Sequence, residues 1–242
     1  MTSNPIVCCV KWGTKYPAEY VNRLRSMVSR HLAHPHDFVC LTEDPTGLDA
    51  RIGTLPLPDA FAGFWNKLSL FRGDLFEPGR TLLYLDVDVV IVGPLDILLN
   101  DPGGFHIIRA FSANPGCNSS VMRFEAGAFA HVYDRFAARA VAILASGRYT
   151  GDQGWICEQV PDAKFFPRQT IVSYKKDMRS HILPVAKKLR LDGWLKAPRF
   201  MTVAPPPGAS IVVFHGKPDP EDVMDAPYGP WKRAPFVKEH WR

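Results

Sequence analysis

The chain has 242 residues, 46% of them hydrophobic, and a formal net charge of +5 at pH 7. This length and composition predict one large domain with a sizeable core, with or without an appendage. No segment reaches the roughly 18 uncharged apolar residues of a membrane-spanning helix, and the first residues lack the basic-then-apolar pattern of a secretory signal, so we expect neither.

Alternating strands and helices are predicted in the first half of the chain. Pro17 suits the first turn of a helix whose apolar face recurs at Tyr20, Leu24 and Met27. The expected elements are strands at 5–10, 36–42, 51–57 and 81–86, and helices at 17–32, 65–76 and 95–99. A strand–helix–strand beginning favours a parallel, doubly wound sheet.

The second half of the chain has a more mixed pattern. We expect strands at 105–110, 119–124, 164–166, 171–174 and 210–214, and helices at 126–146 and 152–159. Asp152, after Gly151, suits the cap at the start of the last helix. Pro and Trp are frequent from Pro218 onward, so residues 1–217 are predicted to form the domain and residues 218–242 a tail packed on or beside it.

The five cysteines predict a reducing compartment. Cys8, Cys9 and Cys40 lie in apolar, strand-like segments, and no two cysteines have the spacing of metal ligands. Disulfides are rare in cytosolic proteins, whereas free cysteines are often buried. We therefore expect reduced core cysteines in a cytoplasmic protein.

Positive charge is concentrated between Tyr174 and Phe200. Eight Lys and Arg residues accompany two Asp residues there, an excess greater than that of the whole chain. Such a region favours an anionic partner, namely a phosphate-bearing acceptor, a lipid surface or a nucleic acid, but a solvated loop is an equally simple interpretation. Trp194, Trp231 and Trp241 nearby suit a membrane interface or stacking on sugars and bases. The sequence has no helix-turn-helix or zinc-finger pattern, which argues against sequence-specific DNA recognition.

Asp86 and Asp88 interrupt an otherwise apolar run at residues 81–92. A buried carboxylate is costly unless it is paired or bound to a metal, and in an extended segment these two side chains point to the same side. Two such oxygen ligands at a strand end can hold Mn²⁺ or Mg²⁺ and leave sites for diphosphate oxygens. The alternative is a surface turn with both carboxylates in water, which the apolar neighbours disfavour.

Several short motifs follow one another in a distinctive order. They are Trp65-Asn66-Lys67-Leu68, Leu85-Asp86-Val87-Asp88, Cys117-Asn118-Ser119-Ser120-Val121-Met122, Gly151-Asp152-Gln153 and Val213-Phe214-His215-Gly216-Lys217-Pro218. With the strand–helix–strand beginning, this set resembles the GT-A glycosyltransferases of the glycogenin and bacterial lipopolysaccharide galactosyltransferase type, over most of residues 5–218. In two departures, Gly154 stands where the family has a second Asp, and the late His, Gly and Lys-Pro elements are compressed.

The resemblance implies an α/β fold: a single GT-A (Rossmann-like) domain with a central, mostly parallel mixed sheet flanked by helices. It implies a metal-dependent hexosyltransferase that uses Mn²⁺ or Mg²⁺ and moves a hexose from a nucleotide sugar, a UDP-sugar, to a hydroxyl acceptor with retention. The acceptor would be a saccharide, a lipid-linked saccharide or a modified nucleic acid. Because related bacterial enzymes touch membrane through such a C-terminal region, residues 174–200 and the tail are expected to make peripheral contact with the inner membrane face.

Individual residues acquire predicted roles in the same way. Asp86 and Asp88 would hold the metal with His215 as a third, nitrogen ligand, and Asp152 and Gln153 would lie at the reacting anomeric carbon. By resemblance, the donor would contact Lys67, Asp86, Asn118, Ser119 and Lys217. The loop at 11–16 follows the first strand, where open α/β sheets bind ligands, so Trp12, Thr14 and Tyr16 suit the base or ribose. A purely structural role remains open for each of these residues. Asp152 could be only a helix cap, His215 a histidine bonded to backbone, Lys67 and Lys217 solvated lysines, and Trp12 and Tyr16 packed aromatic rings.

Two other functions remain open. A sugar nucleotidyltransferase is also an α/β, metal-using enzyme, but its phosphate loop is Gly-rich, whereas residues 11–15 contain one Gly. The other is a non-catalytic module that binds anionic lipid or nucleic acid through residues 174–200.

Overall fold

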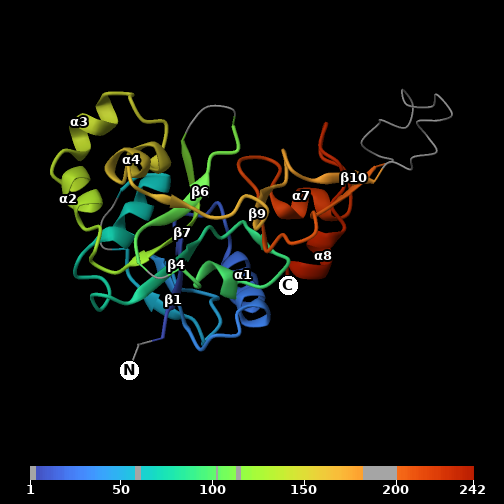
Figure 1. The fold of residues 1–242 in the computed structure, drawn as a ribbon, viewed down its shortest axis with the longest axis horizontal. Coiled ribbons are helices and arrows are strands. Elements are labelled where there is room, and N and C mark those ends of the chain that lie inside the picture. Colours follow the sequence, from blue (N-terminus) through green and yellow to red (C-terminus); the bar gives the residue numbers. More distant parts are fainter. Residues whose placement is uncertain (1–3, 58–60, 102, 113–115, 182–200) are drawn as a thin grey trace.

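The computed structural model describes residues 4–57, 61–101, 103–112, 116–181 and 201–242, which form an α/β fold (Figure 1). The central sheet contains β1 Ile6–Lys11, β2 Asp37–Thr42, β3 Gly53–Leu55, β4 Thr81–Leu85, β6 His106–Arg109, β7 Cys117–Glu125 and β8 Lys164–Phe165. Its strand order is β3-β2-β1-β4-β7-β6-β8. Only β7 runs antiparallel to its neighbours, β4 and β6. The predicted α/β class with a mostly parallel mixed sheet is confirmed.

The parallel half of the sheet is built from strands that are apolar on both faces. β1 is buried throughout and pairs with β2 and β4, with Ile6 opposite Asp37 and Leu82. Helix α1, Ala18–His31, buries its apolar stripe against one face. Because β1 and β4 are parallel and β7 runs the opposite way, the ends of β1 and β4 lie at the same sheet edge as the start of β7.

A second sheet continues the fold after the two aspartates. It consists of β5 Val90–Ile91, β9 Ile171–Ser173 and β12 Ile211–Val213, with β12 parallel to β9 and antiparallel to β5. A further antiparallel pair, β10 Arg179–His181 and β11 Thr202–Ala204, was not predicted from the sequence. Neither strand is an apolar run, since β10 is Arg-Ser-His and β11 is Thr-Val-Ala, so the sequence has no strand signal there.

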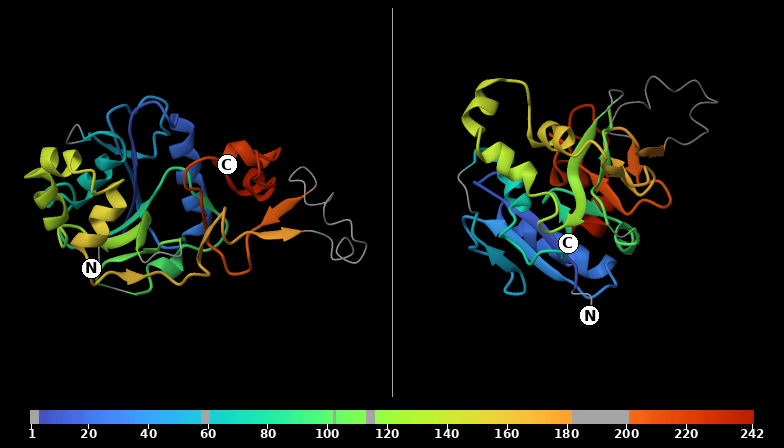
Figure 2. Two further views of the ribbon diagram at one scale, coloured as in Figure 1. Left: turned by 90° about the horizontal axis from the view of Figure 1, so that it is seen from above. Right: turned by 60° about the vertical axis from the view of Figure 1, so that its left-hand side comes forward.

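Residues 218–242 fold back onto α1. They include α7 Pro220–Met224 and α8 Phe236–His240, which lie beside α1 at one end of the molecule (Figures 1 and 2). Trp241 is buried, and its ring meets that of Tyr20 edge-on at 4.8 Å between centroids. This segment therefore contributes to the apolar core that α1 shares.

The opposite end of the molecule carries α2 His131–Ala137, α3 Ala140–Ala145 and α4 Asp152–Gln159 (Figure 2). The prediction of one helix over 126–146 is wrong. Gly127 has φ +80° in the turn that precedes α2, and the backbone leaves the helical region at Arg139, between α2 and α3. Both breaks are local backbone features that an apolar period does not reveal.

The predicted helix at 65–76 is instead a 3-10 helix, η1 Gly63–Phe71. The short helical turn expected at 95–99 is present as η2 Asp96–Leu98. Among the described residues, no helix combines the length and the apolar character that crossing a membrane requires.

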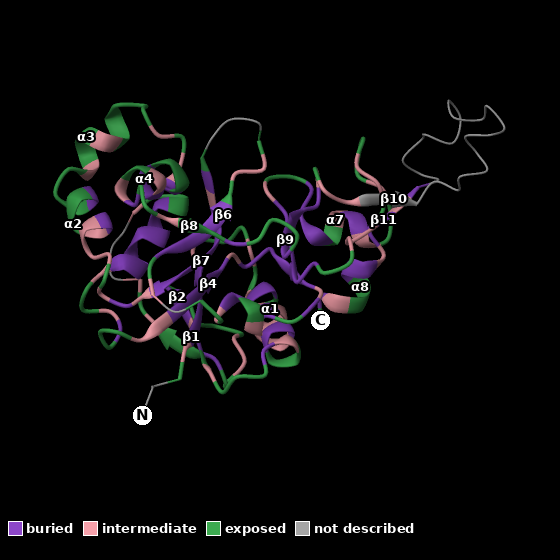
Figure 3. Ribbon diagram, in the orientation of Figure 1, coloured by how far each residue is buried: buried purple, intermediate pink, exposed green. Residues whose placement is uncertain are grey.

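Apolar side chains fill both faces of the central sheet. β1 contributes Val7 and Cys9 to one layer and Ile6, Cys8 and Val10 to the other, which is the alternation expected of a strand. Figure 3 shows the central strands β1, β4 and β7 largely buried, whereas α3 at the edge of the molecule is largely exposed.

The cysteines depart from the prediction. Cys8, Cys9 and Cys40 are buried free thiols. Cys117 and Cys157 instead form a disulfide between β7 and α4, with Cα atoms 6.0 Å apart, so the expectation of reduced cysteines is wrong for this pair. Their proximity depends on α4 packing against β7 and is not visible in the sequence. Because disulfides are uncommon in reducing compartments, this bond does not support the predicted cytoplasmic location. That location stays a prediction.

Candidate active site

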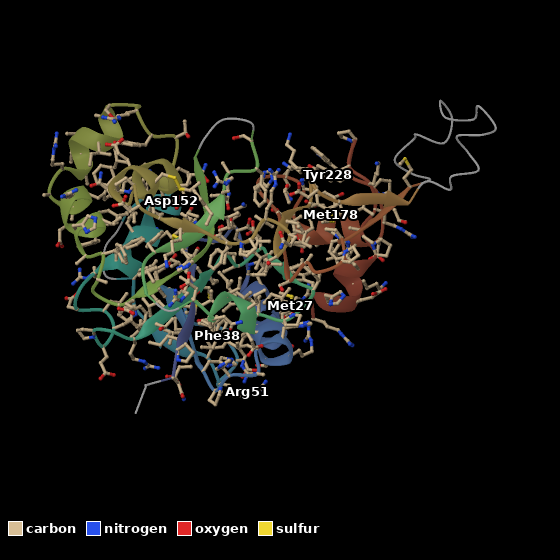
Figure 4. The ribbon with its side chains drawn as sticks, viewed as in Figure 1. Met27, Phe38, Arg51, Asp152, Met178 and Tyr228 are labelled. Atoms are coloured by element: carbon tan, nitrogen blue, oxygen red, sulfur yellow. A yellow bond between two sulfur atoms is a disulfide. The ribbon has the colours of Figure 1, made fainter. Side chains whose placement is uncertain are left out.

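A cleft of about 330 Å³ opens at the sheet edge where β1 and β4 end and β7 begins. The start of α4, where Figure 4 labels Asp152, and the segment after β12 complete its walls. Ten of the twelve residues predicted from the sequence line it: Trp12, Tyr16, Lys67, Asp86, Asp88, Asn118, Ser119, Asp152, Gln153 and His215. The fold thus gathers side chains from segments far apart in the chain.

The other two predicted residues do not line this cleft. Thr14 is exposed in the loop after β1. Lys217 Nζ forms ion pairs with Asp219 at 3.0 Å and with Asp222 at 2.9 Å, at the start of α7. In this structure Lys217 therefore neutralises carboxylates of the C-terminal segment.

Asp86 and Asp88 lie in a turn between β4 and β5, which we call the carboxylate turn (residues 86–89). The Val89 amide donates to the Asp86 carbonyl at 3.4 Å, and the Asp86 amide donates to the Ser120 carbonyl of β7 at 2.8 Å. The expectation of an extended segment is wrong here, because the chain turns before entering β5. The turn is nevertheless not a solvated one, since Asp88 is only 9% exposed.

One oxygen of each carboxylate is held by a neighbouring group. Asp86 Oδ1 accepts from the Tyr84 hydroxyl and pairs with Lys67 Nζ at 3.0 Å. Asp88 Oδ2 accepts from the Tyr16 hydroxyl at 2.8 Å. Asp86 Oδ2 and Asp88 Oδ1 make no hydrogen bond or ion pair with any other residue in the described part of the chain.

The carboxylate turn carries negative charge that its surroundings do not fully offset. Burial, followed by repulsion from Asp86, raises the pKa of Asp88 to about 7. Asp219 adds a third carboxylate nearby, because its Oδ1 accepts from the same Tyr16 hydroxyl at 3.3 Å. A cation beside the turn would relieve this repulsion.

Lys67 links the carboxylate turn to α4. Its side chain is 5% exposed, and Nζ lies 3.0 Å from Asp86 Oδ1, 3.3 Å from Asp152 Oδ2 and 3.1 Å from Ser119 Oγ. Ser119 Oγ also donates to Asp152 Oδ2 at 2.6 Å. Burial disfavours the charged form of Lys67, but the Asp152 and Asp86 carboxylates outweigh it and raise the pKa of this lysine above its ordinary value. One buried cation thus fixes two carboxylates relative to each other.

His215 follows β12 and contributes an imidazole to the cleft. Its Nε2 lies 2.7 Å from Ser173 Oγ, and its ring stacks on Phe111 with centroids 5.5 Å apart. Burial lowers the pKa of His215, and the positive charges of Lys175 and Lys176 lower it further. The imidazole is therefore neutral near pH 7, which is the form that binds metals.

The carboxylates of Asp86 and Asp88 and the imidazole of His215 suit a divalent cation in their chemistry, although the structure does not bring the three groups together. Two carboxylates and a neutral imidazole are ligands that Mn²⁺ accepts. Within the described ranges, however, no three His, Cys, Asp or Glu side chains cluster closely enough to hold a metal ion. The carboxylate turn is thus the part of the site that fits a metal best, with His215 in the same cleft.

The cleft also has lining residues that were not predicted, among them Lys11, Lys15, Phe64 and Thr150. Lys11 is the last residue of β1, Lys15 comes from the loop that follows, Phe64 from η1, and Thr150 from the approach to α4. The two lysines had a recognisable pattern, because they flank aromatic residues in a loop already expected to meet the ligand. Phe64 is exposed, and only the folded structure brings an exposed aromatic ring to the cleft.

The fold is similar to that of solved glycosyltransferases. The galactosyltransferase LgtC, solved in complex with donor and acceptor sugar analogues, matches over 89% of this chain and 88% of that chain, with 13% identity and a TM-score of 0.60. The glycosyltransferase GlyE of Streptococcus pneumoniae TIGR4 matches over 90% of this chain and 56% of that chain, with 15% identity and a TM-score of 0.63.

The bifunctional glycosyltransferase WbbM, solved without ligand, matches over 93% of this chain and 48% of that chain, with 14% identity and a TM-score of 0.59. This chain therefore spans about half of the GlyE and WbbM structures. No protein-family model matches the sequence, and no curated protein matches it in sequence. The structural similarities show that the chain has the GT-A glycosyltransferase fold, as the order of motifs predicted.

Proposed function

We propose that this chain is a metal-dependent glycosyltransferase that moves a hexose from a nucleotide sugar, a UDP-sugar, to a hydroxyl acceptor with retention. The observation that carries the proposal is the meeting of the carboxylate turn, the Lys67–Asp152 pair and the loop at 11–16 in one cleft. The fold, shared with solved glycosyltransferases, supports it. Glycosyl transfer needs such an arrangement, because negative charge develops on the leaving diphosphate while positive charge develops on the sugar.

The loop after β1 is the part of the cleft suited to the nucleotide. Trp12 offers an aromatic face for base stacking, whereas the Tyr16 ring already packs on Tyr20 at 4.7 Å between centroids. Lys11 and Lys15 line the same wall and would attract a diphosphate. A divalent cation bound at the carboxylate turn would supply Lewis-acid stabilisation of the leaving group.

Asp152 is our candidate at the reacting centre. It is buried, and Lys67 and Ser119 both engage its Oδ2, while Oδ1 makes no hydrogen bond or ion pair with another described residue. A carboxylate held in this way presents fixed negative charge to the oxocarbenium-like sugar of the transition state. Gln153 and Asn118, whose side-chain amides approach within 3.5 Å, are suited to binding sugar hydroxyls.

Donor turnover tests the proposal directly. We expect Mn²⁺-dependent release of UDP from a UDP-hexose, and Asp86→Asn or Asp88→Asn should lower its rate roughly 100-fold or more, because charge stabilisation by a metal is worth several kcal/mol. Asp101→Asn is the matched control, since Asp101 is an exposed carboxylate outside the cleft. Unaltered turnover in both turn variants, with folding verified by circular dichroism, would reject the assignment.

A further inference from the structure

Helix α3 exposes an apolar surface that the proposed function leaves unexplained. Its sequence, Ala-Val-Ala-Ile-Leu-Ala over Ala140–Ala145, is apolar throughout, yet none of its residues is buried. Val141 is 84% exposed and Leu144 44% exposed, while Ala140 and Ile143 are only partly buried against the core. A helix of a soluble domain normally turns its apolar side inward and a polar side outward. Val141 and Leu144 lie three positions apart, hence on one side of the helix, and such an exposed apolar face indicates contact with something apolar.

Arginines surround the exposed helix. A hollow of about 540 Å³ lies between α2, α3 and α4, and Arg135, Arg139 and Arg148 line it together with Tyr149 and Ser146. Their positive charge is only partly offset, because Glu158 is the one acidic residue among the described residues that line the hollow. Glu158 pairs with Arg148 at 2.6 Å. The hollow thus carries a net positive charge beside an apolar helix.

Arg139 is the most available of these cations. Arg135 donates to the Gln159 side chain at 2.9 Å, and Arg148 is held by Glu158. The Arg139 guanidinium makes no hydrogen bond or ion pair with the residues that the structure describes. It lies at the start of α3, between the apolar helix and the hollow. A guanidinium in this position is free to pair with a phosphate from outside the protein.

We propose that α3 and the arginine-lined hollow beside it form a docking surface for an anionic phospholipid bilayer. Val141 and Leu144 would enter the interfacial region, while Arg135 and Arg139 would meet lipid phosphates. This combination of exposed apolar side chains and flanking arginines is the pattern of interfacial membrane contacts. It fits a bilayer better than a free anion, which would not cover the apolar residues.

The docking surface also adjoins the cleft. Arg148 and Tyr149 line the hollow, and the next two residues, Thr150 and Gly151, line the cleft. Docking through α3 would therefore bring the rim of the cleft close to the lipid headgroups. The surface lies at the opposite end of the molecule from α7 and α8 (Figures 1 and 2), and thus away from the C-terminal tail that the sequence favoured for membrane contact. Residues 182–200 of the other predicted membrane contact lie outside the described residues.

Vesicle co-sedimentation of the full chain tests the inference without donor or metal, so its outcome does not depend on the proposed activity. We expect binding to vesicles of phosphatidylcholine mixed with phosphatidylglycerol and much weaker binding to phosphatidylcholine alone. The double variant Val141→Asp/Leu144→Asp should lower the partition coefficient about tenfold or more. Arg135→Gln/Arg139→Gln should lower it about fivefold for each charge removed.

Matched controls separate this surface from general effects of charge and apolarity. Ile97→Asp alters an exposed apolar residue of η2, and Arg51→Gln/Arg168→Gln removes two exposed charges elsewhere. These variants should leave the partition coefficient unchanged, and thermal melts should show that all variants fold.

Several results would overturn the inference. One is absence of binding to the anionic vesicles, and another is binding that the α3 variants do not weaken, which would locate the contact elsewhere. A third is self-association in the absence of lipid that Val141→Asp/Leu144→Asp abolishes, because a second copy of the chain would then be the occupant of α3.

Discussion

Replacing Lys67 by Met should destabilise the fold far more than the same substitution at an exposed ion pair. The change keeps a linear, apolar side chain one atom shorter and removes its charge. Lys67 Nζ lies 3.0 Å from Asp86 Oδ1 and 3.3 Å from Asp152 Oδ2. At an effective dielectric constant of about 20, each contact has a gross Coulomb energy of about 5 kcal/mol. Desolvation of the three charges offsets much of this.

The net cost follows from what remains after the cation is lost. Asp152 stays buried beside Asp86 without a counter-charge, and removing one partner of a buried pair typically costs about 3–5 kcal/mol. For a domain of this size that loss lowers the melting temperature by roughly 6–20 °C. Calorimetry or thermal circular dichroism at neutral pH measures it.

Lys164→Met is the matched control, because Lys164 pairs with Asp101 at 3.2 Å and both side chains are more than half exposed. Exposed pairs contribute little, so the melting temperature should barely move. Adding Asp152→Asn to the Lys67→Met chain should recover part of the loss, since it removes the unpaired carboxylate. The reasoning is refuted if Lys67→Met melts no lower than Lys164→Met, or if the second substitution recovers nothing.

Three further predictions concern the ligand, the disulfide and pH. Trp12→Ala should weaken UDP binding by roughly 5- to 100-fold in calorimetric titration, since base stacking is worth about 1–3 kcal/mol. Thr14→Ala changes a residue outside the cleft and should leave UDP binding unchanged. Equal effects of the two substitutions would contradict the assignment of the loop to the base. Cys157→Ser removes a cross-link between residues 40 positions apart. It should lower the free energy of unfolding by about 4 kcal/mol in non-reducing urea titrations. An unchanged urea midpoint of unfolding would argue against the bond. Burial lowers the pKa of His31 and of His240 below 6.5, so these two groups bind more protons in the unfolded chain and make stability fall as the pH drops from about 7.5 to about 5.5, whereas the raised pKa of Asp88 acts in the opposite direction. Replacing both histidines with Asn should remove their contribution, so the free energy of unfolding of the variant should fall less over this pH range than that of the unmodified chain, and an identical pH profile would contradict the prediction.

The parallel half of the sheet was predictable because its strands are buried on both faces. β1 and β4 appear in the sequence as continuous apolar runs, and α1 between them has a regular apolar stripe. These patterns locate the sheet edge, and hence the cleft, to within a few residues. The order of motifs added the residues of β7 and α4 that the cleft gathers.

Features that depend on tertiary contacts were not predictable. The carboxylate turn is buried because Tyr16 and Lys67, distant in sequence, hold its two aspartates. The apolar residues on both sides suggested an extended segment there, but the chain turns, with the Val89 amide donating to the Asp86 carbonyl and the Asp86 amide donating to Ser120 of β7. The Cys117–Cys157 bond likewise exists because α4 packs on β7.

Exposure of an apolar helix is equally invisible in sequence. The residues of α3 were predicted as part of one long helix over 126–146, whereas the fold places them in a short helix at the edge of the molecule. Apolar composition predicts burial only when another element is present to cover the residues. At α3 the described structure provides little cover, so Val141 and Leu144 stay exposed.

A crystal structure grown with Mn²⁺ and UDP would test the proposed function most directly. Anomalous scattering locates manganese independently of the model of the protein. We predict a manganese peak in contact with Asp86 and Asp88, with the diphosphate of UDP beside it and the uracil near Trp12. Manganese and UDP bound away from the carboxylate turn, with both aspartates facing only water or protein, would contradict the central assignment.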